Sequence, residues 1–190
     1  MPAGAQRPCD VAVLCVTPRS HYKKMAGCDC YDAARNAFTF PGGLPVVAHP
    51  PCRSWSRMRH FVKADVRIER ELAYRCIDWV REFGGVLEHP KKSTLWLHCR
   101  LPLPCEKPDK YGGFSIELDQ HSFGHKTTKS TWLYICGIDR AAVPEIPLNF
   151  NPVRKHQWEH LSMNQRRATP PAFASWLVEL ARRCGKGGAA

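Results

Sequence analysis

Long apolar runs are absent from this sequence. No stretch approaches the roughly 18 apolar residues that a membrane-spanning helix requires, and residues 1–8 lack the apolar segment of a secretory signal peptide. The sequence also contains no internal repeat. These absences argue against a membrane or secreted protein, and we expect a cytoplasmic one.

Acidic residues are scarce. Lysine and arginine outnumber aspartate and glutamate by 28 to 17, which gives a formal charge of +11. Such a charge attracts polyanions, so nucleic acid or a nucleotide is the favoured class of partner. The alternative is that the excess only maintains solubility, because the basic residues are scattered along the chain.

Closely paired cysteines of the Cys-x2-Cys type are also absent, although the chain contains ten cysteines. Several lie inside apolar runs, as Cys15, Cys76 and Cys136 do, and this favours reduced thiols over a disulfide framework. A zinc site remains an alternative, built from Cys28 and Cys30 or from the set His98, Cys99 and Cys105.

The length of 190 residues and the hydrophobic content of 44% are enough for one sizeable core. We expect a single domain over residues 1–184 and a disordered tail over 185–190. Apolar runs predict strands at 11–16, 28–31, 44–48 and from 86 onward, and a hairpin of strands at 114–118 and 131–138. Helical spacing predicts one helix at 65–83, ended by Gly84 and Gly85, and a last helix that opens at Pro170 and Pro171.

The segment 44–87 therefore has the order strand, helix, strand, which builds a parallel sheet. Both strands of this segment end in polar loops that contain proline. Because the carboxyl ends of parallel strands meet at one edge of the sheet, we expect Cys52 and Glu88 to reach the same crevice.

Four motifs follow this framework in order: Pro50-Pro51-Cys52, Glu88-His89-Pro90, Gln120 with a loop that contains Lys126 and Lys129, and residues 168–172 before the last helix. Together they resemble motifs of the cytosine-C5 DNA methyltransferases, over roughly residues 44–183. The resemblance implies a Rossmann-like, methyltransferase-type three-layer α/β sandwich with a mostly parallel sheet and an antiparallel hairpin. It also implies a transferase that modifies cytosine or a related pyrimidine, in DNA or in a nucleotide, with S-adenosylmethionine as methyl donor. The compact size is similar to that of phage-encoded proteins.

Methylation of carbon 5 of cytosine first requires addition of a nucleophile to carbon 6, and the resemblance gives this role to Cys52. Nearby cations would make the thiol more reactive. Glu88, with a pKa raised by partial burial, would share a proton with ring nitrogen 3. A cation from Lys126 or Lys129 would hold the ring carbonyl or a phosphate. Further residues expected to contact the substrate are Pro51, Arg53, Ser54, Trp55, Arg57, His89 and Gln120.

The cofactor would lie against the loops after the first two strands, where the candidates are Ser20, Tyr22, Asp32, Asn36 and, from the Cys52 loop, Pro50. Asp32 is suited to a ribose hydroxyl and Asn36 to an adenine, although both are also common turn residues. Simpler roles also exist for Cys52 as a buried apolar residue, for Glu88 as a helix cap or ion pair, and for His49 and His89 as hydrogen-bonding loop residues.

Two parts of the family pattern are missing. Residues 17–22, after the first strand, contain no glycine, and only residues 130–161 separate Lys129 from Ser162, too few for a target-recognition region. These departures leave two alternatives open. One is an enzyme that modifies a base or cleaves a glycosyl bond without a methyl donor. The other is a catalytically inert module that binds nucleic acid or protein.

Overall fold

The structure, a computed structural model, describes residues 8–56, 64–149 and 160–185. Its centre is a six-stranded sheet in the order β2-β1-β3-β4-β6-β5. The strands are β1 (Val11–Leu14), β2 (Cys28–Tyr31), β3 (Val46–Ala48), β4 (Gly85–Pro90), β5 (Phe114–Asp119) and β6 (Ser130–Cys136). The first four are parallel, whereas β6 is antiparallel to both of its neighbours. The predicted α/β class, the mostly parallel sheet and the antiparallel hairpin are therefore confirmed.

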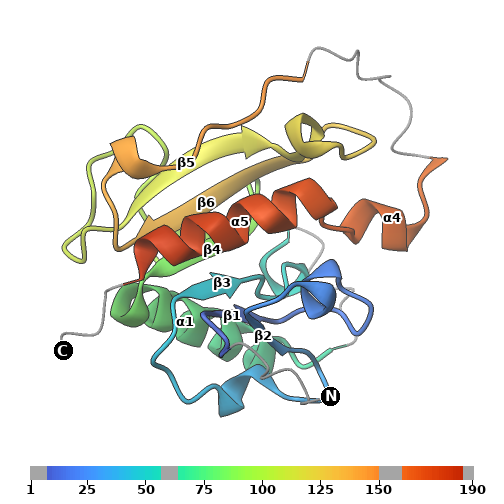
Figure 1. The fold of residues 1–190 in the computed structure, drawn as a ribbon, viewed down its shortest axis with the longest axis horizontal. Helices are drawn as coiled ribbons and strands as arrows, with labels where there is room; N and C mark the ends of the chain where they lie inside the picture. The colour runs from blue at the N-terminus through green and yellow to red at the C-terminus, as the bar shows by residue number, and fades with distance from the viewer. Residues whose placement is uncertain (1–7, 57–63, 150–159, 186–190) are drawn as a thin grey trace, which may run out of the picture.

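Two long helices cover the sheet, α1 (Val66–Phe83) and α5 (Pro171–Cys184), which lie on opposite sides of it (Figure 1). The alternation of side chains along the strands explains this arrangement. Ala12 and Leu14 belong to the apolar cluster under α1, while Val11 and Val13 belong to the cluster under α5. Shorter helices are α2 (Leu95–His98) and α4 (Met163–Arg167), and the 3-10 turns are η1 (His21–Lys24), η2 (Ala37–Thr39), η3 (Arg53–Trp55), η5 (Gln120–Phe123) and η6 (Arg140–Ala142).

Helix α1 begins and ends at residues suited to those positions. Asp65 is the N-cap, and its carboxylate accepts hydrogen bonds from the amides of Arg67 and Ile68 at 2.9 and 3.3 Å. At the other end, Gly84 and Gly85 have φ values of 80° and 125°. A side chain at Gly85 would meet the carbonyl of Val46 at 2.1 Å, so this glycine lets β4 lie against β3 directly after the helix.

All ten cysteines are free thiols, as predicted. In the described ranges no group of three or more potential ligands is placed to hold a metal ion, so the alternative zinc sets do not assemble there. Within the same ranges, no helix has both the length and the apolar character needed to cross a membrane. The predicted tail over 185–190 lies, apart from Gly185, outside the described residues.

One polar side chain is sealed into the sheet. His89, in β4, is 1% exposed and lies edge-on to Trp96, with 6.3 Å between the ring centroids. Neither ring nitrogen meets hydrogen-bond geometry with any group in the described part of the chain. The pKa of His89 is lowered to about 4, chiefly by burial and also by the charge of His49, against opposing effects from Glu88 and the Pro51 carbonyl. The ring is therefore neutral in the folded protein at pH 7.

This burial predicts a loss of stability in mild acid. Because the pKa of His89 in the folded protein lies below its ordinary value of 6.5, unfolded chains bind a proton between about pH 6.5 and 4 that the folded protein does not bind. The free energy of unfolding should fall over this window by about 3 kcal/mol from this group. Urea titrations of His89→Leu across pH 4 to 7 should show that much less pH dependence, and the exposed His21→Gln should match the wild type. An unchanged slope in His89→Leu would contradict the assignment.

Candidate active site

The candidate site lies at the carboxyl edge of the sheet. The chain leaves β1 for β2 on one side and then returns to β3 on the other side of β1. Such a reversal leaves a crevice at the ends of the two strands, where open α/β sheets bind ligands. Register also matters here, because Ala48 of β3 is paired with Leu87 of β4. The next residues, His49 and Glu88, therefore lie side by side.

Four side chains form a continuous chain of hydrogen bonds at this edge, which we call the polar relay: Tyr22, His49, Glu88 and Gln120. The Tyr22 hydroxyl lies 3.0 Å from His49 Nε2, and His49 Nδ1 lies 3.0 Å from Glu88 Oε2. On the other side, Gln120 Nε2 donates to Glu88 Oε1 at 3.1 Å and to the hydroxyl of Thr131 at 3.0 Å. The relay thus joins the loop after β1, the end of β3, the end of β4 and the hairpin.

The electrostatics of Glu88 differ from the expectation. Burial raises the pKa of this carboxyl, but the hydrogen bond and charge of His49, together with Lys129 and His89, outweigh burial and bring the pKa to about 2. The predicted raised pKa is therefore wrong. The error arose because the sequence suggested the burial of Glu88 without showing that His49 lies beside it. Glu88 is a carboxylate at neutral pH.

Cys52 lies at the start of η3 and its side chain reaches solvent. Enough protein surrounds the sulfur for burial to raise the pKa of the thiol, and the charge of Glu88 raises it further. The cations Arg167 and Lys129 act in the opposite direction without reversing the shift. The structure thus places Cys52 within electrostatic range of Glu88, as the motif order suggested. In the resting protein, however, Cys52 is a thiol rather than an activated thiolate.

Lys129, just before β6, is a cation that interacts electrostatically with both Glu88 and Cys52. Burial lowers the pKa of its ammonium group, while Glu88 and Cys52 raise it. Its Nζ also lies 3.2 Å from the Ala168 carbonyl and 3.5 Å from that of Arg167, so it holds the segment before α5 close to the site. Lys126 differs, because its side chain is exposed and makes no polar contact with a described residue. Of the two predicted lysines, the structure brings only Lys129 to the site.

Residues after Cys52 support the loop. Glu69 of α1 is 6% exposed and accepts hydrogen bonds from both Arg53 and Ser54. The Trp55 ring is fully buried against Tyr74, 5.8 Å away between centroids. Ser54 and Trp55 therefore anchor the Cys52 loop to α1, and their side chains are not available for the substrate contacts that were predicted.

The other predicted substrate residues differ in where the structure places them. Pro51 is partly buried beside Cys52, and Gln120 is fully buried, where it orients Glu88. His89 is enclosed on the α1 side of the sheet, so a substrate contact is not available to it either. The predicted hydrogen-bonding role is confirmed for His49, whereas the His89 ring interacts with the Pro51 carbonyl without reaching ordinary hydrogen-bond geometry. Arg57 lies outside the described residues.

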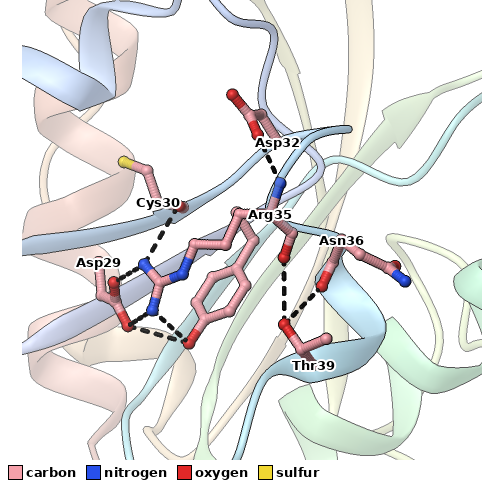
Figure 2. Close-up of polar contacts among 7 residues, drawn as sticks. Asp29, Cys30, Asp32, Arg35, Asn36 and Thr39 are labelled. Atoms are coloured by element: carbon pink, nitrogen blue, oxygen red, sulfur yellow. Dashed lines mark hydrogen bonds and ion pairs between the residues drawn. The ribbon is translucent and has the colours of Figure 1, made fainter.

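The predicted cofactor residues are bonded to the protein itself. Asp32 follows β2 directly, but Oδ1 accepts from the amides of Ala34 and Arg35, both at 3.0 Å, and Oδ2 pairs with Lys23. Asn36 caps η2, accepting from the Phe38 amide at 3.2 Å. Figure 2 shows how closely Asp32 and Asn36 lie to Arg35, whose guanidinium binds Asp29. Both residues act as turn residues, the simpler role considered for them.

The other predicted cofactor residues lie in the loop after β1 and in the Cys52 loop. Tyr22 is 1% exposed and its hydroxyl is bound to His49, so its side chain is not open to a ligand. Ser20 closes the turn that leads into η1, its amide donating to the Thr17 carbonyl at 3.0 Å, and Pro50 is buried. Cys15, directly after β1, has a left-handed φ of 63°, a conformation that glycine adopts more easily. Of the five predicted cofactor residues, Tyr22, Asp32, Asn36 and Pro50 are therefore buried or bonded within the protein, an arrangement that does not fit S-adenosylmethionine.

Sequence reasoning underestimated His49 and missed Glu69, Thr131 and Arg167. A signal for His49 was present: Val46-Val47-Ala48-His49 and Gly85-Val86-Leu87-Glu88 each place a polar residue after three buried ones. In adjacent parallel strands these two polar residues become neighbours. The other three come from the first turn of α1, from β6 and from the end of α4, where local pattern gives no sign of the site.

No known protein-family model matches this chain and no curated protein sequence matches it, so its function must be inferred from the site itself.

Proposed function

We propose that this chain is an enzyme that modifies a pyrimidine base by adding Cys52 to ring carbon 6, with Glu88 against the ring edge. The observation that carries the proposal is that three groups from separate segments shift each other's pKa. These groups are Cys52, Glu88 and Lys129. Perturbed groups that converge at the carboxyl edge of a parallel sheet are typical of functional sites. The Rossmann-like, methyltransferase-type architecture and a DNA or nucleotide partner belong to the same proposal.

The site has the parts that such an addition needs. Attack by sulfur on carbon 6 shifts electron density into the ring, toward nitrogen 3 and the carbonyl. Lys129, in range of both Cys52 and Glu88, supplies a positive charge for this density and for the thiolate. Glu88, as a carboxylate, accepts a hydrogen bond from the exocyclic amino group of cytosine. Addition makes carbon 5 nucleophilic, so that it takes up a deuteron from D2O even when no other electrophile is present.

The methyl donor is a separate question. In the resembled family, S-adenosylmethionine supplies the methyl group to carbon 5. Here Tyr22 and Asp32 are already bonded to partners within the protein, so we derive no step through this cofactor. This observation favours the alternative of base modification without a methyl donor.

One observation favours a catalytically inert binding module. Cys52 rests as a thiol, because burial and Glu88 raise its pKa, and the ionised Glu88 holds no proton for ring nitrogen 3. With the net charge of +11, such a module would bind polyanions through phosphate contacts alone. In that case, affinity for an oligonucleotide would fall with added salt and would not change in Cys52→Ser or Glu88→Gln.

Replacement of the nucleophile tests the enzymatic proposal directly. The wild type should exchange the carbon 5 hydrogen of deoxycytidine, free or in an oligonucleotide, for deuterium in D2O, as followed by NMR. Cys52→Ser should reduce this exchange by about 1,000-fold or more, because the alcohol is a far weaker nucleophile. Cys105→Ser, at another exposed cysteine, is the matched control. Exchange at the wild-type rate in Cys52→Ser would rule out the mechanism.

The electrostatic coupling at the site predicts two opposite effects on thiol reactivity. Glu88→Gln removes the charge that raises the Cys52 pKa, so alkylation of Cys52 by iodoacetamide at pH 8 should become faster. Lys129→Gln removes a charge that lowers this pKa, so alkylation should become slower. A change of about threefold to tenfold in each direction is expected, since one pKa unit alters the thiolate fraction tenfold. Peptide mass spectrometry reports Cys52 separately from Cys105, and equal rates in both variants would show that the three groups do not interact.

The arrangement of the first two loops predicts weak cofactor binding. Calorimetry with S-adenosylmethionine, and with its demethylated product, should show no saturable heat at ligand concentrations near 1 mM, a level that would detect about 4 kcal/mol of binding energy. Asp32→Ala, which frees Lys23 and the turn amides, should behave in the same way. Saturable micromolar binding by the wild type, lost in Asp32→Ala, would instead show that the loops rearrange to accept the cofactor.

A further inference from the structure

His49 occupies the centre of the polar relay and has no role in the addition as described so far. We propose that His49 is a positioning residue that supplies, through Glu88, the proton taken up by ring nitrogen 3 when Cys52 attacks. This inference rests on the proposed function and adds the group that completes its proton balance. It is drawn from the geometry of the relay, in which one imidazole bridges Tyr22 and Glu88.

The hydrogen-bond partners determine the direction of each bond. An ionised carboxylate can only accept, so His49 Nδ1 donates to Glu88 Oε2 across 3.0 Å. Gln120 is fully buried and donates through Nε2 to the other oxygen of Glu88, which fixes the plane of the carboxylate. At the far side of the imidazole, the Tyr22 hydroxyl lies 3.0 Å from Nε2. Glu88 and His49 are thus held on both sides, with side chains only 14% and 13% exposed.

The need for such a group follows from the charge of Glu88. Nitrogen 3 of cytosine has a lone pair and no hydrogen, so a carboxylate alone cannot donate to it. Burial raises the pKa of Glu88, but His49 lowers it and the pKa is about 2. Glu88 therefore holds no proton of its own at neutral pH. The imidazolium form of His49 holds one, at a nitrogen already hydrogen-bonded to Glu88.

The proposed step balances in atoms and charge. The Cys52 thiolate forms a bond to carbon 6, the π pair between carbons 5 and 6 shifts toward carbon 4, and the pair between carbon 4 and nitrogen 3 moves onto nitrogen 3. That nitrogen takes the proton of Glu88, which in turn takes the Nδ1 proton of His49. Neutral His49 keeps its hydrogen on Nε2 and donates it to the Tyr22 oxygen. Reversal of the addition returns the proton along the same path.

The charged and titratable groups around His49 are consistent with this path. Burial and Glu88 raise the pKa of Tyr22 well above its usual value, with smaller contributions from Cys28 and Cys30, so Tyr22 stays a hydroxyl. The neutral ring of His89 adds no charge at pH 7. Lys129 and Cys52 both interact electrostatically with the Glu88 carboxylate. Within the relay, Glu88 is thus the group that accepts the Nδ1 proton of His49.

The test measures the pH profile of carbon 5 deuterium exchange in three variants. His49→Gln can still donate an amide hydrogen to Glu88 but has no titratable proton, so it separates orientation from proton supply. Tyr22→Phe removes the partner of Nε2. His21→Gln, an exposed neighbour in η1, is the matched control. Thermal melts and the imidazole Nδ1 proton resonance in 1H–15N spectra report the fold and the His49 to Glu88 bond without relying on activity.

The wild type should give a bell-shaped profile that rises as Cys52 ionises and falls as the shared proton is lost. His49→Gln should lose about 100-fold in rate and its alkaline limb, with an unchanged melting temperature. Tyr22→Phe should lose about tenfold in rate, and His21→Gln should match the wild type. The Nδ1 resonance should be present in the wild type and absent in Glu88→Gln.

Different failures point to different steps. If Cys52→Ser abolishes exchange while His49→Gln keeps the wild-type rate and profile, the role of His49 is overturned and the nucleophile stands. Absence of the Nδ1 resonance from an active wild type overturns the relay in the same way. A wild type that shows the resonance but no exchange overturns the proposed function, and with it the proton supply by His49.

Discussion

The contact between His49 and Glu88 is the interaction on which the candidate site depends. It joins the ends of two adjacent parallel strands, and it exists because Ala48 is in register with Leu87. A slip of one residue would turn every side chain of a strand to the opposite face and would separate the pair. Gly85 protects this register, since any side chain there would collide with the Val46 backbone. The chemistry of the site thus begins with the close packing of β4 against β3.

Much of this framework could be predicted from the sequence because it follows from local patterns. Apolar runs located the strands, and the spacing from Leu72 to Phe83 identified α1 together with its glycine exit. The prolines after β3 and at the end of β4 indicated that Cys52 and Glu88 lie at one edge of the sheet, although Glu88 and Pro90 belong to β4 and not to the predicted loop. These inferences succeeded because the period of a strand or helix and the stops at glycine and proline are properties of short segments.

The orientation and charge of individual side chains could not be predicted in the same way. Ser54 and Trp55 follow Cys52 and were predicted to contact the substrate, but Glu69, distant in the sequence, binds the Ser54 hydroxyl in the protein interior. Asp32 stands in the expected place after β2, yet Lys23 and two backbone amides already occupy its oxygens. Each difference arises from a partner that only the folded chain brings close. Electrostatic predictions for single residues fail for the same reason, as the lowered pKa of Glu88 shows.

The resting protonation states have a consequence for how the proposed enzyme would work. In the free protein, the charge of Glu88 holds the pKa of Cys52 up, so the nucleophile is kept as a thiol. When a pyrimidine brings nitrogen 3 to Glu88, the proton supplied by His49 partly neutralises that carboxylate.

The cations Lys129 and Arg167 then act on the Cys52 thiol with less opposition, and the pKa of the thiol falls. Because the interaction between Cys52 and Glu88 is reciprocal, ionisation of the thiol in turn favours the proton on Glu88. The interaction between Cys52 and Glu88 would therefore keep the thiol unreactive without a substrate and activate it once the correct ring edge is bound. Such a coupling would limit unwanted reactions of an exposed cysteine, and it would make recognition of nitrogen 3 part of the chemical step.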